Sequence, residues 1–350
     1  MGEVRKAIEY IRGRWSDYSI FMQELREYMD RLGSFSTSTE EDRRTLESLL
    51  SSSKEWGDRS PTHANSFDVL HLYTSQFGYN TIFGLLNVAF RTDAVTEQGQ
   101  EKELRSAVFL IELLNIDLFN YLLRDPLKSG FQGIVYRGVS FTEEEIDDFR
   151  TFATIPVRDR YWSIPLAMMS ASTSVGTALE FALRDVAQDP TKRPFLWRIH
   201  VANIDPDLLR IYNERFPSSV VTTLCAVPVD EVSRFPQEGE VLLRGPWFQF
   251  IRLHKEFVDD VGMVMDVMDV VMLNTNRDHP SVAELGVERG DEARRLFALL
   301  VGISRARICE HLALEYGLTS DAEEFERIHE EQAHHLYPAT IRDRLGCLVS

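Results

Sequence analysis

A block of short, strand-like runs between about residues 131 and 256 constrains the fold of this chain more than any other feature. The runs, among them GIVYRGVSF, FLWRIHVANI and EVLLRG, are rich in β-branched and aromatic residues, and turn-forming sequences such as QDPTKRP and FPQEGE separate them. One clear helical pattern, VGTALEFALRDVA, interrupts the block. Because the strands do not alternate with helices, a doubly wound parallel sheet is not expected, and we predict an α+β fold.

Apolar residues at helical spacing flank the block on both sides. Before the block, this spacing predicts helices within about 4–32 and 66–124, each with a broad apolar face. The change of pattern along the chain predicts three parts: an N-terminal helical region over 1–60, a central domain over 61–256 and a C-terminal helical region over 257–350.

The start of the C-terminal region has an unusual polar pattern. In VDDVGMVMDVMDVVM, Asp259, Asp266 and Asp269 recur at helical spacing among apolar residues. This predicts a helix with a narrow polar stripe and an otherwise buried surface. Two more helices are expected over 291–316 and 321–336.

Composition limits the classes of partner and the compartment. The chain has 350 residues, and its formal charge of −17 repels phosphate backbones, so nucleic acid is an unlikely partner. The sparse cysteines Cys225, Cys309 and Cys347 suit a reducing compartment. The N-terminus has no signal-peptide core, and no apolar run reaches the length of a membrane span. We therefore expect no membrane partner, and a cytoplasmic location or export by a route without a cleavable signal peptide.

The run GIVYRGVSF places an arginine in an apolar strand. Side chains alternate along a strand, so Arg137 shares a face with Val135 and Val139, while Ile134 and Tyr136 point the other way. Apolar residues on both faces indicate a strand that is covered on both sides. An arginine in such a strand needs an anion beside it, which is either a structural salt bridge or a bound ligand.

Three hydroxyl residues end a second strand, in SASTSVGTALEFA. Ser172, Thr173 and Ser174 lie between the strand and the helical pattern that follows. Ser174 or Thr177 is expected to cap that helix. A hydroxyl run at a strand-to-helix junction can also direct its side chains into a binding cleft, and the residues alone leave both interpretations open.

Two carboxylates two positions apart precede a third strand, in FPQEGEVLLRG. On an extended chain Glu238 and Glu240 would point the same way, with Cβ atoms about 6.6 Å apart. At an effective dielectric constant of about 20, two charges at that distance repel by about 2.5 kcal/mol. A surface loop would tolerate such a pair, whereas an enclosed site would give the two carboxyl groups different protonation behaviour.

Taken in chain order, the Arg-Gly strand, the S-T-S run and the E-x-E pair resemble the R-S-E signature of mono-ADP-ribosyltransferases. The match is to the arginine-specific subgroup that carries E-x-E, and it covers about residues 66–256. The stretch LYTSQFGYNTIFGLLNVAFR, residues 72–91, is similar to a helical region of the same family. The resemblance implies a catalytic domain over 61–256 with two small β-sheets that form an NAD cleft.

The resemblance also implies a reaction: NAD+ loses nicotinamide, and ADP-ribose passes to an acceptor, by analogy an arginine on a target protein. Arg137 would hold the ribose and phosphate region of NAD+, and Gly138 would let the main chain approach the nicotinamide amide. Ser172 would orient the catalytic Glu240, whose charge would stabilise the oxocarbenium-like transition state. Glu238 would bind and polarise the acceptor guanidinium, which is a poor nucleophile while protonated.

Other residues gain roles only from the same resemblance. Thr173 and Ser174 would shape the pocket wall, and Phe235 would contact the acceptor side chain. Phe181 would stack near nicotinamide, although a core phenylalanine on its helix is an equal alternative. Lys192 and Arg193 are interpreted as solvated loop charges rather than as pyrophosphate ligands.

The alternatives to transfer onto arginine are hydrolysis of NAD+, with water as the acceptor, and a catalytically inert binding or scaffold module. NAD+ is the expected substrate, and no metal is expected. In HEEQAH, His329 and His334 are five residues apart, which places them on different faces of a helix rather than at zinc-ligand spacing.

Overall fold

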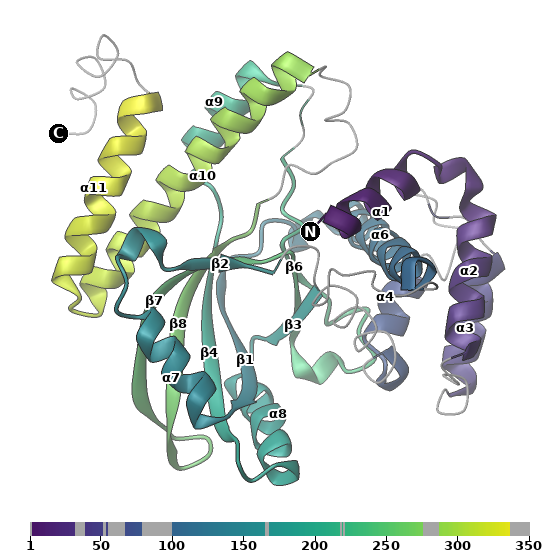
Figure 1. The fold of residues 1–350 in the computed structure, drawn as a ribbon, viewed down its shortest axis with the longest axis horizontal. Helices are drawn as coiled ribbons and strands as arrows, with labels where there is room; N and C mark the ends of the chain where they lie inside the picture. Colours follow the sequence, from purple (N-terminus) through teal and green to yellow (C-terminus); the bar gives the residue numbers. More distant parts are fainter. Residues whose placement is uncertain are drawn as a thin grey trace. The chain divides into compact units, whose positions relative to one another are not determined.

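The computed structural model describes residues 2–31, 39–51, 54, 67–78, 100–164, 168–217, 219, 221–275 and 287–336 (Figure 1). The chain divides into two compact units, and each is described by itself. The first unit comprises Met1–Ser129, Leu166–Met169 and Val227–Glu240, and the second comprises Gly130–Pro165, Ser170–Ala226 and Val241–Ser350.

The first unit is built mainly from helices. These are α1 (Gly2–Arg12), α2 (Tyr18–Arg31), α3 (Glu40–Ser51), α4 (Asp68–Tyr73) and α6 (Gln100–Arg124). The helical pattern expected over 4–32 is therefore two helices, separated by the 3-10 turn Trp15–Asp17. Most of the pattern expected between α4 and α6, including residues 79–91 of the family-like stretch, lies outside the described residues.

Helix α6 is the centre of this unit. The rings of Trp15, Tyr18 and Phe21 lie within 6 Å of the Phe109 ring on α6, at centroid separations of 5.7, 5.4 and 5.4 Å. By length and composition, Glu101–Arg124 could cross a membrane, contrary to the expectation that no apolar run is long enough. However, 83% of its most apolar window is buried inside the protein, as in the core helix of a soluble domain.

The strands form one hydrogen-bonded sheet of eight strands, in the order β2-β7-β8-β4-β1-β3-β6-β5. Their bounds are β1 (Gly133–Phe141), β2 (Tyr161–Ser163), β3 (Met168–Ser172), β4 (Arg193–Ala202), β5 (Ala226–Pro228), β6 (Glu240–Arg244), β7 (Trp247–Val258) and β8 (Met263–Leu273). Strand β4 pairs antiparallel with β1 and parallel with β8. The sheet and its flanking helices confirm the predicted α+β class.

The expected two small sheets correspond to a five-stranded part, β2-β7-β8-β4-β1, and a three-stranded part, β3-β6-β5. Between the two parts, the described residues give the register as Tyr136 of β1 opposite Ser172 of β3. By contrast, β1 and β4 pair along the whole of β1, from Gly133 to Phe141. The junction between the two parts therefore falls at the strands that carry the Arg-Gly and S-T-S motifs.

The helix predicted from Asp259, Asp266 and Asp269 is wrong, because this stretch forms a β-hairpin. Strand β7 ends at Val258, the turn contains Gly262 with φ +64°, and β8 runs from Met263 to Leu273. Strand β8 lies between β7 and β4 and is almost wholly buried. A central strand covered on both faces lacks the alternation of polar and apolar residues that identifies most strands in a sequence.

The two aspartates of β8 point to opposite faces, since they are three residues apart on a strand, and cationic side chains meet both. Asp266 accepts a hydrogen bond from Lys255 at 3.2 Å. Asp269 is fully buried and accepts hydrogen bonds from Arg252 at 2.7 Å and Arg198 at 3.4 Å. Burial alone would raise the pKa of Asp269, but bonds from His200 and Arg252 and the nearby arginine charges outweigh it and hold the pKa below its usual value.

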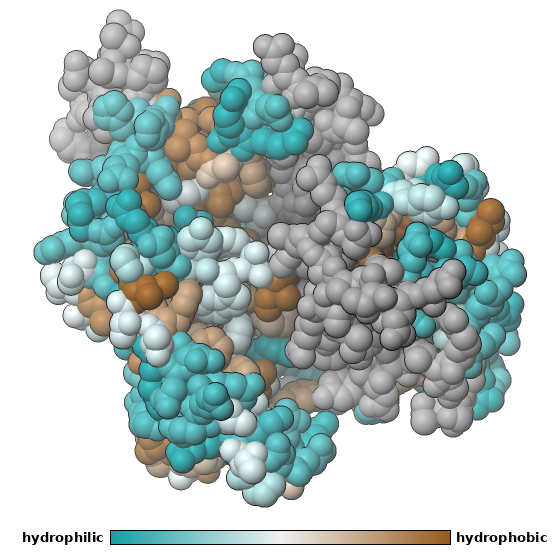
Figure 2. Space-filling model, in the orientation of Figure 1, coloured by the Kyte–Doolittle hydropathy of each residue, from teal (hydrophilic) through white to brown (hydrophobic). Residues whose placement is uncertain are grey.

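The expected boundary at residue 256 falls inside β7, so the sheet continues into the region that was expected to be helical throughout. The helices of the second unit are α7 (Glu143–Phe152), α8 (Val175–Gln188), α9 (Pro206–Arg215), α10 (Val287–Glu315) and α11 (Thr319–Leu336). Thus the two helices expected near the C-terminus are confirmed. They pack against Ile251 of β7 and Val271 of β8. The surface over α7 and α8 is mostly hydrophilic in Figure 2, so their outer faces meet solvent.

Helix α8 packs against β1 and β4, and Gly138 makes this approach possible. A Cβ added at Gly138 would lie 1.7 Å from the carbonyl oxygen of Ala178 on α8. The neighbouring atom belongs to the main chain, so the helix itself would have to move. The structure therefore gives Gly138 a packing role that the sequence did not suggest.

We predict that Gly138→Ala lowers the free energy of unfolding by about 1–3 kcal/mol, as overpacking a tight contact usually does. Gly176→Ala, on α8 itself, is the matched control, because its Cβ would meet nothing closer than Ser174 Oγ at 3.7 Å. This control should be neutral or stabilising by about 0.5–1 kcal/mol. Urea unfolding of the two variants measures the difference, and equal midpoints would contradict the packing role.

Candidate active site

The E-x-E pair lies on a turn and a strand end rather than along an extended chain. Pro236–Glu238 form a 3-10 turn, Gly239 adopts a left-handed conformation with φ +56°, and β6 begins at Glu240. The predicted extended geometry of Glu238 and Glu240 is therefore wrong, and the repulsion calculated for it does not apply. The left-handed position requires a residue such as glycine, which explains the central residue of the motif here.

Glu240 is held by Ser233, a residue that the sequence interpretation missed. The Ser233 hydroxyl donates to Glu240 Oε2 at 3.2 Å, and it accepts a hydrogen bond from the Phe235 amide at 3.1 Å. The main chain of Glu240 is fixed as well, because its carbonyl accepts a hydrogen bond from Val229 N at 2.9 Å. A serine two residues before a turn that leads to the glutamates is the local pattern that could have revealed this contact.

Phe235 and Glu238 flank the 3-10 turn on the same segment. The amide of Glu238 donates to the Phe235 carbonyl at 3.0 Å, and both side chains are half-buried. This short turn fixes the main chain between the aromatic residue and the first glutamate. The roles in acceptor recognition that the resemblance gives them stay predictions.

Arg137 lies on β1 as predicted and is half-buried. Its Nη1 donates to the main-chain carbonyl of Ser170, on the neighbouring strand β3, at 2.6 Å. The guanidinium is therefore held against the strand that carries Ser172, two residues further along. Arg137 is opposite Trp197 in the register of β1 with β4, so the strand around it is paired on both sides.

The S-T-S run makes the transition from β3 to α8. Ser172 ends β3 and is buried, and its hydroxyl accepts a hydrogen bond from Ser174 N at 2.9 Å. Ser174 is the N-cap of α8, with its hydroxyl accepting from Thr177 N at 3.3 Å. The capping interpretation is thus confirmed for Ser174, whereas Thr177 is the residue whose amide is capped. Thr173 is exposed beside them.

Three further candidates lie on or next to α8. Phe181 is half-buried rather than part of the core, and the guanidinium of Arg184 lies 4.9 Å from the centre of its ring. Lys192 and Arg193 make surface ion pairs, with Asp189 at 3.9 Å and Glu143 at 2.9 Å respectively. The interpretation of these two cations as solvated charges agrees with their partners and exposure.

The order of strands brings the three motifs together in the sheet. Strands β1, β3 and β6, which carry Arg137, Ser172 and Glu240, are consecutive neighbours in the order. They are separated along the chain by more than thirty residues in each case, so only the fold makes them adjacent. An arginine can supply a cation for a phosphate, a serine a hydroxyl and a glutamate a carboxylate.

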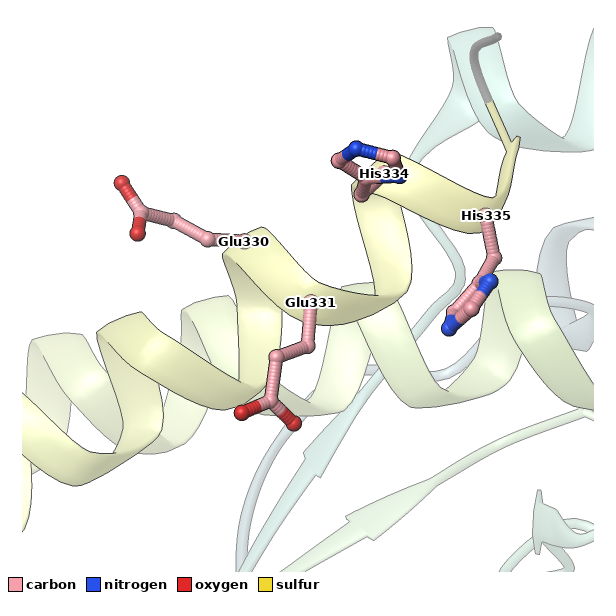
Figure 3. A pocket seen from close by; sticks show the side chains of 4 residues that line it. All are labelled: Glu330, Glu331, His334 and His335. Carbon is pink, nitrogen blue, oxygen red and sulfur yellow. The ribbon is translucent and has the colours of Figure 1, made fainter.

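A surface pocket on α11 contains the histidine-rich stretch. It is lined by Glu330, Glu331, His334 and His335, and in Figure 3 Glu331 and His335 point to the same side of the helix, whereas Glu330 and His334 point elsewhere. Within the described parts of the chain, no group of three or more His, Cys, Asp or Glu side chains is placed to hold a metal ion. In the HEEQAH stretch Glu330, Glu331 and His334 are exposed, whereas His329 and Gln332 are half-buried.

Comparison with known proteins finds no matching family model and no matching curated protein. Solved structures that are similar to this chain include several bacterial ADP-ribosyltransferases. HopU1 of Pseudomonas syringae pv. Tomato is 13% identical, with a TM-score of 0.37 over 59% of this chain and 76% of that one. The Vis toxin of Vibrio splendidus is 13% identical, with a TM-score of 0.37 over 60% of this chain and 73% of that one. An ADP-ribosyltransferase of Clostridium botulinum is also similar, at 13% identity and a TM-score of 0.33, over 68% of this chain and 96% of that one.

Proposed function

We propose that this chain cleaves NAD+ at the bond between ribose and nicotinamide and transfers ADP-ribose to an acceptor. The observation that carries the proposal is the order of strands, in which β1, β3 and β6 are consecutive. Each of these strands carries one member of the R-S-E set, and the Arg137 guanidinium is bonded to the strand of Ser172. Three motifs that are distant in sequence are thus carried by strands that are neighbours in the sheet order.

In the proposed reaction the C1′–N bond breaks, and its electron pair leaves with neutral nicotinamide. Positive charge then develops on the ribose, where the carboxylate of Glu240 stabilises it. Arg137 binds the anionic part of NAD+ through its guanidinium, which carries donors in a planar fork. Gly138 follows Arg137 on β1, Ser172 to Ser174 lead from β3 into α8, and Phe181 lies on α8.

We further propose that the acceptor is an arginine side chain of a target protein. A guanidinium nitrogen attacks C1′ of the ribose and loses one proton, so a base must stand beside it. Glu238 supplies that base, and Phe235 contacts the apolar stem of the arginine. Both residues belong to the turn that leads into Glu240, which supports a shared location for cleavage and transfer.

Replacing Glu238 separates the two halves of this reaction. We predict that Glu238→Gln lowers transfer of ADP-ribose to protein by about 10²–10⁴-fold, the usual contribution of a positioned base, while release of nicotinamide to water persists. Parallel assays of nicotinamide and of protein-bound label measure the two rates. Equal loss of both would contradict an acceptor-specific role, and nicotinamide release without any label on protein, in the unaltered chain, would identify water as the acceptor.

A further inference from the structure

We propose that Arg234 is a positioning residue. It fastens the segment Val227–Glu240, which carries Glu240, to the N-terminal helices α3 and α4. This inference rests on the proposed function of Glu240 and gives those helices a task. The segment Val227–Glu240 and the N-terminal helices belong to the same compact unit, so all the contacts involved are internal to it.

Arg234 binds two helices at once. Its Nη1 forms an ion pair with the carboxylate of Glu41 on α3, and its Nη2 donates to Thr45 Oγ1, one turn further along, at 3.4 Å. Its main-chain amide donates to Thr74 Oγ1, at the C-terminal end of α4, at 3.3 Å. The Arg234 side chain is 24% exposed, whereas the Glu41 side chain is 69% exposed, so water reaches the ion pair from the Glu41 side.

The neighbours of Arg234 in sequence transmit this anchoring to Glu240. Ser233 comes directly before it and donates to the Glu240 carboxylate, while the amide of Phe235, directly after it, donates to the Ser233 hydroxyl. Ser233 N also bonds to the Val229 carbonyl at 2.7 Å, and Val229 N to the Glu240 carbonyl at 2.9 Å. The segment is therefore a closed loop, and fixing Arg234 fixes the hydroxyl that holds the catalytic carboxylate.

The helices that hold Arg234 are themselves fixed by buried contacts. Thr74 Oγ1 donates to the Leu70 carbonyl at 3.1 Å, which ties it to the preceding turn of α4. At the other end of α4, the carboxylate of Asp117 on α6 accepts hydrogen bonds from Val69 N at 2.9 Å and Leu70 N at 3.2 Å. Arg234 thus connects the glutamate segment to α4, which Asp117 ties to α6.

His71 reports the position of Arg234 independently of activity. Burial and then the charge of Arg234 hold the pKa of His71 below its usual value. Removing that charge should raise the pKa of His71, which a titration of its ring protons by NMR can follow. A pKa of His71 that does not change in Arg234→Ala would place Arg234 elsewhere and overturn the proposal.

The kinetic test compares Arg234→Ala with Arg105→Ala. Arg105 pairs with Glu24 at 3.1 Å in the same unit but contacts no residue of the Val227–Glu240 segment by any hydrogen bond or ion pair in the described chain. Arg234→Ala should lower kcat for nicotinamide release about tenfold or more with little change in KM for NAD+, while Arg105→Ala keeps both. The exchanged pair, Glu41→Arg with Arg234→Glu, should recover part of the lost kcat.

Two results would overturn the positioning role. One is an unchanged kcat in Arg234→Ala, and the other is an equal fall in both variants that follows their loss of stability. If the unaltered protein releases no nicotinamide, the proposed function fails. Amide hydrogen exchange then tests whether Arg234 anchors the Val227–Glu240 segment. Exchange at Val229 and Ser233 should accelerate in Arg234→Ala but not in Arg105→Ala; equal exchange in both would overturn the anchoring as well.

Discussion

Glu240→Gln is expected to lower the rate of nicotinamide release from NAD+ by about 10³-fold or more. Glutamine has nearly the same size and can still accept the Ser233 hydrogen bond, but it lacks the negative charge that, in the proposed reaction, stabilises the developing ribosyl cation. Because that charge acts on the transition state, the loss should fall on kcat, and calorimetry should show that NAD+ still binds. Release of nicotinamide, followed by chromatography, measures the effect.

Glu214→Gln is the matched control, because Glu214 is an exposed carboxylate on α9. It should retain the full rate. Turnover retained in Glu240→Gln would reject this residue as the catalytic carboxylate, whereas loss in both variants would indicate a general effect of carboxylate removal on the fold.

The second large effect concerns the buried ion pair that holds α4. Lys54 Nζ lies 2.9 Å from Asp117 Oδ1, and the side chains are 7% and 0% exposed. Lys54→Met leaves the carboxylate buried without its cation, which typically costs about 3–5 kcal/mol of the free energy of unfolding. Arg44→Met, which removes an exposed pair with Glu40 on α3, should cost at most about 1 kcal/mol.

Asp117→Asn tests the same pair through its pH dependence. Burial raises the pKa of Asp117 to about 6, although the charge of Lys54 and the amides of α4 act against it. A carboxyl group with a higher pKa in the folded state binds its proton more tightly there, so its contribution to stability falls as the pH rises from about 4 to 6. The free energy of unfolding should therefore decline in this window by about 1–3 kcal/mol relative to Asp117→Asn.

Denaturant unfolding at pH 4, 5, 6 and 7 measures this difference, which should become constant above the raised pKa. A difference that stays flat from pH 4 to 7 would show that Asp117 titrates as an exposed carboxyl group does. Recovery of stability in the double variant Lys54→Met with Asp117→Asn would confirm that the unpaired charge causes the loss.

The strands that carry Arg137 and Glu240 were predictable because their signals are local. GIVYRGVSF and EVLLRG are short, β-rich runs bounded by turns, and the structure has β1 and β6 there. The cap of α8 at Ser174 was predictable for the same reason, since its hydroxyl bonds an amide three residues away. By contrast, β8 was mistaken for a helix because burial on both faces removes the alternation that identifies a strand.

The geometry of the glutamate pair and its supports could not be obtained from sequence. The left-handed Gly239 ends the 3-10 turn between Glu238 and Glu240, so the extended chain assumed from their spacing is not present. The contact of Arg234 with Glu41 joins residues 193 positions apart, and such a pair has no local pattern. The central pairing of β1 with β3 depends likewise on long-range packing rather than on propensity.

The most direct test of the account is incubation of the purified chain with NAD+ labelled in its adenylate part and with a cell lysate. We predict stoichiometric release of nicotinamide, label bound covalently to protein, and the modified side chain identified by mass spectrometry as arginine. The account would be contradicted if no nicotinamide appears above the chemical background and calorimetry detects no binding of NAD+.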